Sequence, residues 1–155
     1  MIDKDSYSRI HSLLPIACID LVIVRTDAVL LVKRKNEPLK DNWFIPGGRL
    51  HRGEFVQDAI ERIAKEETGL TVSRAAVFLI FENLIFDADP FGHGLGTHKV
   101  SLAFATKTMI EGEPLKLDMT QHDEARWYKP EAIINGGFHH YMTRAVRLCF
   151  EQLYV

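Results

Sequence analysis

The segment from Gly48 to Leu70 constrains the fold of this chain more than any other part of its sequence. The chain reads Pro-Gly-Gly at positions 46–48, and a helical pattern follows this turn. Glycine leaves backbone groups free to face a ligand, and carboxylates at helical spacing suit a hard cation such as Mg²⁺. We therefore expect a cation and phosphate site here, with an ordinary solvated helix face as the alternative. The charged residues that would build the site are Glu54, Arg62, Glu66 and Glu67.

The apolar residues of the same segment are spaced to form one stripe along a helix. The pattern ends at Thr68–Gly69, where Gly69 suits the position just after a helix. The members of the stripe are Phe55, Val56, Ala59, Ile60 and Ile63.

Strand patterns surround this helix. The run Ile16–Arg25 is rich in Ile and Val, which predicts a strand buried on both faces, and Ala28–Lys35 pairs with it as a hairpin. The order of elements predicts one domain over residues 1–155, with a mixed sheet covered by helices on both faces, an α/β/α sandwich. The other expected elements are helices at 3–14, from Pro130 and at 141–153, and strands within 70–86, at 98–106 and at 125–128.

Composition limits the partners that this chain can bind. Its net charge of −2 supplies no basic field for nucleic acid, so a phosphate ligand must be held by local arginines. No apolar run approaches the roughly 20 residues that span a bilayer, and the start of the chain has no apolar signal core. We expect a cytoplasmic protein that binds neither nucleic acid nor membrane. The two cysteines, Cys18 and Cys149, lie far apart and are expected to be buried thiols.

Two further features suggest a polar site. Asp20 interrupts the apolar strand, and a buried carboxylate is costly unless it has a partner. We favour a functional role for it over a purely structural one. The basic cluster Lys33–Lys35 ends the next strand shortly before the Pro-Gly-Gly turn. These side chains either contact a phosphate or form an ordinary solvated strand edge.

The central segment resembles a Nudix box, whose pattern is G-x5-E-x7-R-E-U-x-E-E-x-G-U, where U is a bulky apolar residue. Ile63 stands where the box has a glutamate, so this helix carries one metal ligand fewer, and Ala64 is smaller than the usual residue. The residues that match the pattern are Gly48, Glu54, Arg62, Glu66, Glu67, Gly69 and Leu70.

The chain is also similar, over nearly its whole length, to GDP-mannose mannosyl hydrolases, whose box is degenerate at the same position. The matching segments include KRKNEP, NWFIPGGRL, ERIAKEETGL, Thr97–His98 and QHDEARW, whereas Lys99 replaces an aromatic residue of the family. The resemblance implies a Nudix-type enzyme that uses Mg²⁺, or Mn²⁺ in its place. It would cleave the sugar C1–O bond of GDP-mannose or a related GDP-sugar with water, and release GDP and free sugar.

The resemblance also implies roles for individual residues. The carbonyl of Gly47, with Glu67 and Gln121, would hold the cation. His122, placed in a polar loop before the 125–128 strand, would be the general base, since an imidazole titrates near neutral pH. Arg34 would stabilise the departing GDP.

Four residues would complete the site according to the same resemblance. Arg49 and Arg62 would add positive charge or orient other groups. Asp20 would bind the sugar or steady its developing positive charge. Tyr7 would lie near the guanine, contributed from a dimer partner in a homodimer.

Two other functions remain open from the sequence. A Nudix pyrophosphohydrolase acting on another nucleoside diphosphate compound would use Glu66 and Glu67 for the metal. A catalytically idle nucleotide-binding module would explain the glutamate that is missing at position 63.

Overall fold

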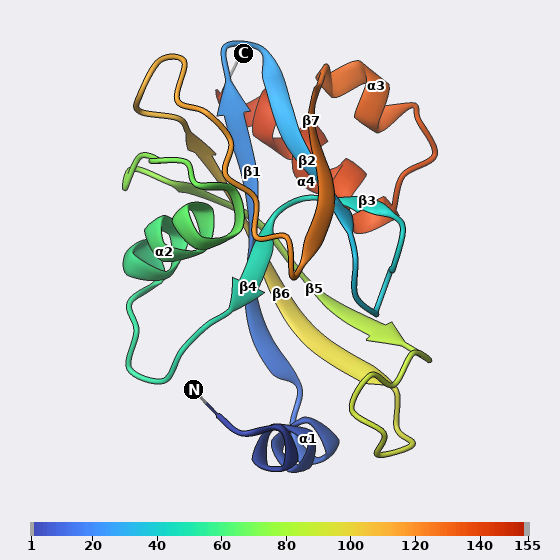
Figure 1. The fold of residues 1–155 in the computed structure, drawn as a ribbon. Coiled ribbons are helices and arrows are strands. Elements are labelled where there is room, and N and C mark those ends of the chain that lie inside the picture. Colours follow the sequence, from blue (N-terminus) through green and yellow to red (C-terminus); the bar gives the residue numbers. More distant parts are fainter. Residues whose placement is uncertain (1, 154–155) are drawn as a thin grey trace.

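A mixed sheet forms the centre of the computed structural model, which describes residues 2–153 (Figure 1). Within these residues the sheet has seven strands. Its main path runs β3-β2-β1-β6-β5, while β4 pairs with β1 and β7 pairs with β2. The strands are β1 (Ile16–Arg25), β2 (Ala28–Arg34), β3 (Trp43–Phe44), β4 (Gly47–Arg49), β5 (Val77–Phe86), β6 (Thr97–Lys107) and β7 (His122–Tyr128).

Strand β1 is the hub of the sheet. It pairs antiparallel with β2 and β4 and parallel with β6, so the sheet is mixed as predicted. Its side chains alternate between two cores, because successive residues of a strand point to opposite faces. Ile19, Leu21 and Ile23 pack in one core, whereas Val22 and Val24 pack in the other.

Helices cover both faces of the sheet, which explains why β1 is apolar on both sides (Figure 1). The helix α2 (Val56–Thr68) packs against the first core, and α4 (His140–Leu153) packs against the second beside the short α3 (Pro130–Ile134). The predicted α/β/α sandwich is therefore confirmed. None of the helices within residues 2–153 is long and apolar enough to cross a membrane.

The helix α2 ends as the sequence predicts. Gly69 adopts a left-handed conformation with φ of 75°, and its N–H donates to the carbonyl of Lys65 at 3.0 Å. The predicted stripe is wrong at one end. Phe55 is the residue before the helix and its side chain is 75% exposed, because the chain is still extended there and turns the ring away from the core.

The N-terminal helix α1 (Lys4–Leu13) begins at Asp3, whose side chain accepts a hydrogen bond from the Ser6 N–H. It lies against the loop between β5 and β6. The Ser8 hydroxyl donates to the carbonyl of Phe91 at 3.1 Å, and the Tyr7 ring meets the Phe91 ring edge-on with centroids 4.8 Å apart.

Strand β7 is longer than the sequence predicts. It begins at His122 instead of Ala125, because β2 continues to offer pairing partners as far as Arg34, which pairs with His122 past a register shift at Lys33/Arg34. The placement of His122 in a solvated loop is therefore wrong. The residue starts a strand and is only 3% exposed.

Candidate active site

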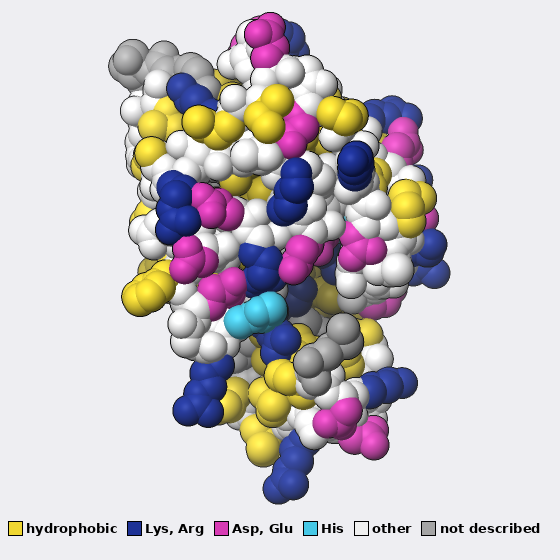
Figure 2. All heavy atoms as spheres, turned by 60° about the vertical axis from the view of Figure 1, so that its left-hand side comes forward, with side chains coloured by type: hydrophobic (Ala, Val, Ile, Leu, Met, Phe, Trp, Pro, Cys, Tyr) yellow, Lys and Arg dark blue, Asp and Glu magenta, His cyan; other side chains and the backbone are white. Residues whose placement is uncertain are grey.

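A cavity of about 740 Å³ opens between α1, β4, the C-terminal end of α2 and the turn before β7. On the face in Figure 2, acidic and basic side chains are interspersed, so no uniformly basic surface forms there. Two of the residues to which the sequence assigned a role, Glu54 and His122, do not line the cavity. Those that do are Tyr7, Asp20, Arg34, Gly47, Arg49, Arg62, Glu66, Glu67 and Gln121.

The floor of the cavity consists of neighbouring residues on β1 and β6. Cys18 pairs with Ser101 in the parallel register, and Lys99 and Asp20 lie two residues away along their own strands. Because side chains alternate along a strand, all four point to the same face. This is the face that α4 covers further along the strands.

Asp20 is held within this floor, where it is 7% exposed. The Tyr141 hydroxyl of α4 donates to Asp20 Oδ2 at 3.0 Å. Burial raises the pKa of Asp20, while the charge of Lys99 and the Tyr141 hydrogen bond act in the opposite direction. A carboxylate that is buried at a cavity wall and needs outside groups to remain ionised suits a ligand-facing role.

The two glycines of the Pro-Gly-Gly turn are required by close packing. A Cβ atom on Gly47 would lie 2.0 Å from Asp20 Oδ1, and one on Gly48 would lie 3.1 Å from Ile63 Cγ1. Ile63 is 1% exposed and belongs to the core against β1. The residue that replaces the glutamate of the box thus fills space beneath the turn and offers no ligand atom.

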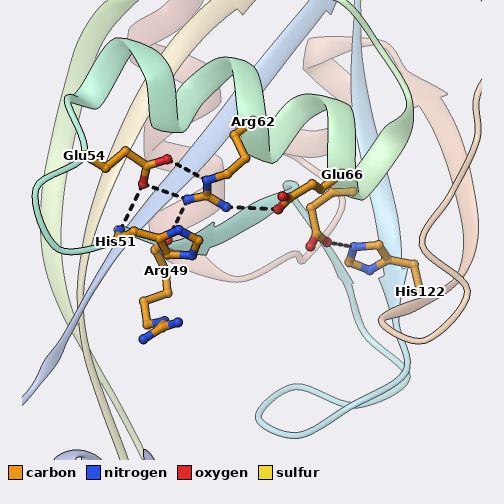
Figure 3. Close-up of polar contacts among 7 residues, drawn as sticks. Arg49, His51, Glu54, Arg62, Glu66 and His122 are labelled. Atoms are coloured by element: carbon orange, nitrogen blue, oxygen red, sulfur yellow. Dashed lines mark hydrogen bonds and ion pairs between the residues drawn. The ribbon is translucent and has the colours of Figure 1, made fainter. Parts of the chain in front are cut away.

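Arg62 ties α2 to the segment that precedes it (Figure 3). Its Nε donates to Glu54 Oε1 at 2.6 Å and its Nη2 donates to Glu54 Oε2 at 2.9 Å. The remaining contacts are Nη1 with Glu66 Oε2 and Nη2 with the carbonyl of Arg49, both at 3.0 Å. The His51 N–H also donates to Glu54, and these hydrogen bonds, led by that from Arg62, lower the pKa of Glu54 to about 2. The contacts agree with an orienting role for Arg62.

Glu67 and His122 form a direct contact between Glu67 Oε2 and His122 Nε2 (Figure 3). The other ring nitrogen, Nδ1, is buried and has no hydrogen-bond partner among residues 2–153. Spacing along the chain gave no signal for this pair, because its members are 55 residues apart.

Arg34, Arg49 and the Tyr7 ring are among the residues that line the cavity. Burial lowers the pKa of Arg34, although the carboxylates of Asp20 and Glu67 favour its charged form, and its Nε donates to the carbonyl of Pro38 at 2.7 Å. The Arg49 guanidinium lies 5.2 Å from the centroid of the Tyr7 ring, a cation–π arrangement. Tyr7 reaches this cavity within its own chain.

The donor atoms of the cavity fit a hard cation. Among residues 2–153, no group of three or more His, Cys, Asp or Glu side chains is arranged to hold a metal ion. A cation here would therefore need other oxygens beside the Glu67 carboxylate, and Gly47 and Gln121 line the same cavity. Asn36 Nδ2 donates to Gln121 Oε1 at 3.2 Å and so orients its amide. One carboxylate with neutral oxygens suits Mg²⁺, which keeps several waters and binds phosphate oxygens.

The family comparison agrees with this geometry, since the model of the NUDIX domain matches residues 15–148. The chain belongs to the Nudix family. Its α2 is accordingly the Nudix helix. The chain is 33% identical over 143 residues to the low-salt glycan biosynthesis protein Agl8 of Haloferax volcanii, which covers 92% of the chain and 87% of that protein. It is also 38% identical over 79 residues to an ADP-ribose pyrophosphatase of Methanocaldococcus jannaschii, covering 51% of the chain but 46% of that relative.

Solved Nudix structures share the fold. The NUDIX domain of Shewanella oneidensis NrtR, complexed with ADP ribose, aligns with a TM-score of 0.69 at 15% identity over 90% of this chain and 89% of that one. The C. elegans Ap4A hydrolase binary complex aligns with a TM-score of 0.68 at 22% identity over 90% of this chain and 98% of that one. At these identities the likeness establishes the architecture alone.

Proposed function

We propose that this Nudix protein hydrolyses GDP-mannose or a related GDP-sugar to GDP and free sugar, with water attacking C1 of the sugar. The observation that supports this best is the position of Ile63 in the core. Because position 63 offers no carboxylate, the Nudix helix lines the cavity with Glu66, which binds Arg62, and with Glu67. Asp20 and Gln121 line the same cavity from other elements. The relative named for low-salt glycan biosynthesis supports a sugar-linked substrate.

Each residue then has a task that its position allows. Glu67, Gln121 and the Gly47 carbonyl would hold Mg²⁺, which when bound neutralises charge on the diphosphate and improves GDP as a leaving group. Arg34, which lines the cavity near the carboxylates of Asp20 and Glu67, would stabilise the negative charge on departing GDP. Asp20 would accept a sugar hydroxyl or steady the positive charge that develops at C1.

His122 would accept the proton of the attacking water. Nδ1 is enclosed by protein, so the acceptor would be Nε2, which contacts Glu67 in the structure. Glu67 would release Nε2 when it holds the cation, and Nε2 would then be unprotonated and able to take the proton from water. The ring lies on a strand and is therefore held more firmly than a loop histidine would be.

Phosphoanhydride cleavage is the second candidate function. Glu66 lines the same cavity as Glu67, so two carboxylates of the Nudix helix would be near a diphosphate bound there. The similarity to an ADP-ribose pyrophosphatase points in the same direction. On a nucleotide sugar this reaction would yield a nucleoside monophosphate and a sugar phosphate.

Product analysis with a matched pair of variants tests the proposal. Purified protein with GDP-mannose and Mg²⁺ is expected to release GDP and free mannose, separated by chromatography. His122→Ala should lower kcat by about 100-fold or more, the usual contribution of a general base. The control His51→Ala removes an exposed ring whose backbone N–H, and not its side chain, contacts Glu54, and it should retain activity. Release of GMP would instead support the second function, and no turnover of any nucleotide sugar would refute the first.

A further inference from the structure

Tyr141 reaches the floor of the cavity from α4, the helix that covers this same face of the sheet further along the strands. It lies in the first turn of α4 and is 1% exposed in the core between α4 and the sheet. Its ring stacks on Phe44 with centroids 6.1 Å apart and an interplanar angle of 21°. A phenol buried in this way needs a partner for its hydroxyl, and Asp20 Oδ2, at 3.0 Å, is that partner.

Both oxygens of the Asp20 carboxylate have a close neighbour. Oδ1 lies so close to Gly47 that no side chain fits there, and Oδ2 accepts the Tyr141 hydrogen bond. The Ser101 hydroxyl, 1% exposed on the adjacent strand, also helps to favour the ionised form. Rotation of the carboxylate would therefore break the Tyr141 contact.

We propose that Tyr141 is a positioning residue, which holds the Asp20 carboxylate in the orientation that faces the sugar of a bound nucleotide sugar. The inference rests on the proposed function, because it acts through the role assigned to Asp20. It makes the C-terminal helix α4 part of the active site, although Tyr141 itself need not touch substrate. A hydrogen bond to an ionised group is roughly twice as strong as one between neutral groups, so its loss should be measurable.

A kinetic cycle tests the positioning role. Tyr141→Phe removes one oxygen from a packed ring and is expected to lower kcat roughly 10- to 100-fold, while KM changes less than about threefold. Tyr128→Phe, the same change at a half-buried ring on β7, is the matched control and should leave both constants near those of the wild type. In an Asp20→Ala background, Tyr141→Phe should have no further effect on the residual kcat. An additional loss of the same size in that background would show a role independent of Asp20 and overturn the proposal.

An unfolding cycle on the same four proteins tests the contact without any substrate. The shifts in the urea unfolding midpoint for Tyr141→Phe and Asp20→Ala should not add up to the shift for the double variant, because both single changes break the same hydrogen bond. Additive midpoints would overturn the proposal whatever the kinetics show. If the wild type turns over no nucleotide sugar, the proposed function and the positioning role both fail, whereas the unfolding cycle still decides whether Tyr141 holds Asp20.

Discussion

Replacing Glu54 with Gln should destabilise the protein far more than the same change at Glu66, although both carboxylates bind Arg62. Glu54 accepts two hydrogen bonds from Arg62 and one from the His51 N–H, and its side chain is 13% exposed. Glu66 makes one contact at i,i+4 spacing, and its side chain is 60% exposed.

The structure sets the size of the difference. The pKa of Glu54 falls from 4.5 to about 2, which corresponds to roughly 3 kcal/mol of free energy of unfolding. The Arg62 side chain is 22% exposed, so solvent screening reduces the expected loss for Glu54→Gln to about 2 kcal/mol. Glu66→Gln should cost about 0.5 kcal/mol or less, as exposed i,i+4 pairs do.

The pH dependence identifies the cause. The folded-state pKa of Glu54 is depressed, so its contribution is complete above pH 4.5 and is lost as the pH falls from 4.5 towards about 2. Urea unfolding of both variants at pH 7 and at steps below pH 4.5 should show the Glu54→Gln difference shrinking towards zero. Equal losses for the two variants, or a Glu54→Gln loss that does not change with pH, would refute the reasoning.

Two further predictions follow from single contacts. Gly69→Ala should lower the free energy of unfolding by at least about 1–2 kcal/mol, because φ is 75° and the new Cβ would lie 2.7 Å from Lys116 Cβ. Gly53→Ala is its control, because φ there is 77° and the new Cβ would have nothing within 4 Å. An equal loss of stability in both variants would show that the clash with Lys116 contributes nothing. Gln121→Leu should raise the Mg²⁺ concentration that gives half-maximal activity by about tenfold or more, measured by metal titration of turnover. An unchanged titration curve would remove Gln121 from the metal site.

Local patterns made much of the fold predictable. The boundaries of β1 and the Gly69 helix end follow from an apolar Ile/Val run and from the backbone freedom of glycine, both of which act over a few residues. Most of the predicted site residues, though not Glu54 or His122, also meet at one cavity, because the turn and the Nudix helix lie against β1.

Contacts across long sequence separations could not be predicted. The contact of His122 with Glu67 spans 55 residues, and that of Tyr141 with Asp20 spans 121. Both depend on strand pairing and on where a helix crosses the sheet, which tertiary packing decides. The position of Asp20 in an apolar strand predicted that the carboxylate needs a partner, but only the folded structure identifies that partner as Tyr141.

The site of bond cleavage is the central claim, and isotope labelling tests it most directly. The purified protein is incubated with GDP-mannose and Mg²⁺ in ¹⁸O-water, and the masses of the products are measured by mass spectrometry. Attack at the sugar carbon predicts that the label appears in free mannose and that the GDP remains unlabelled. Label in a nucleotide phosphate or in a sugar phosphate would contradict the account and assign phosphoanhydride cleavage to this Nudix protein.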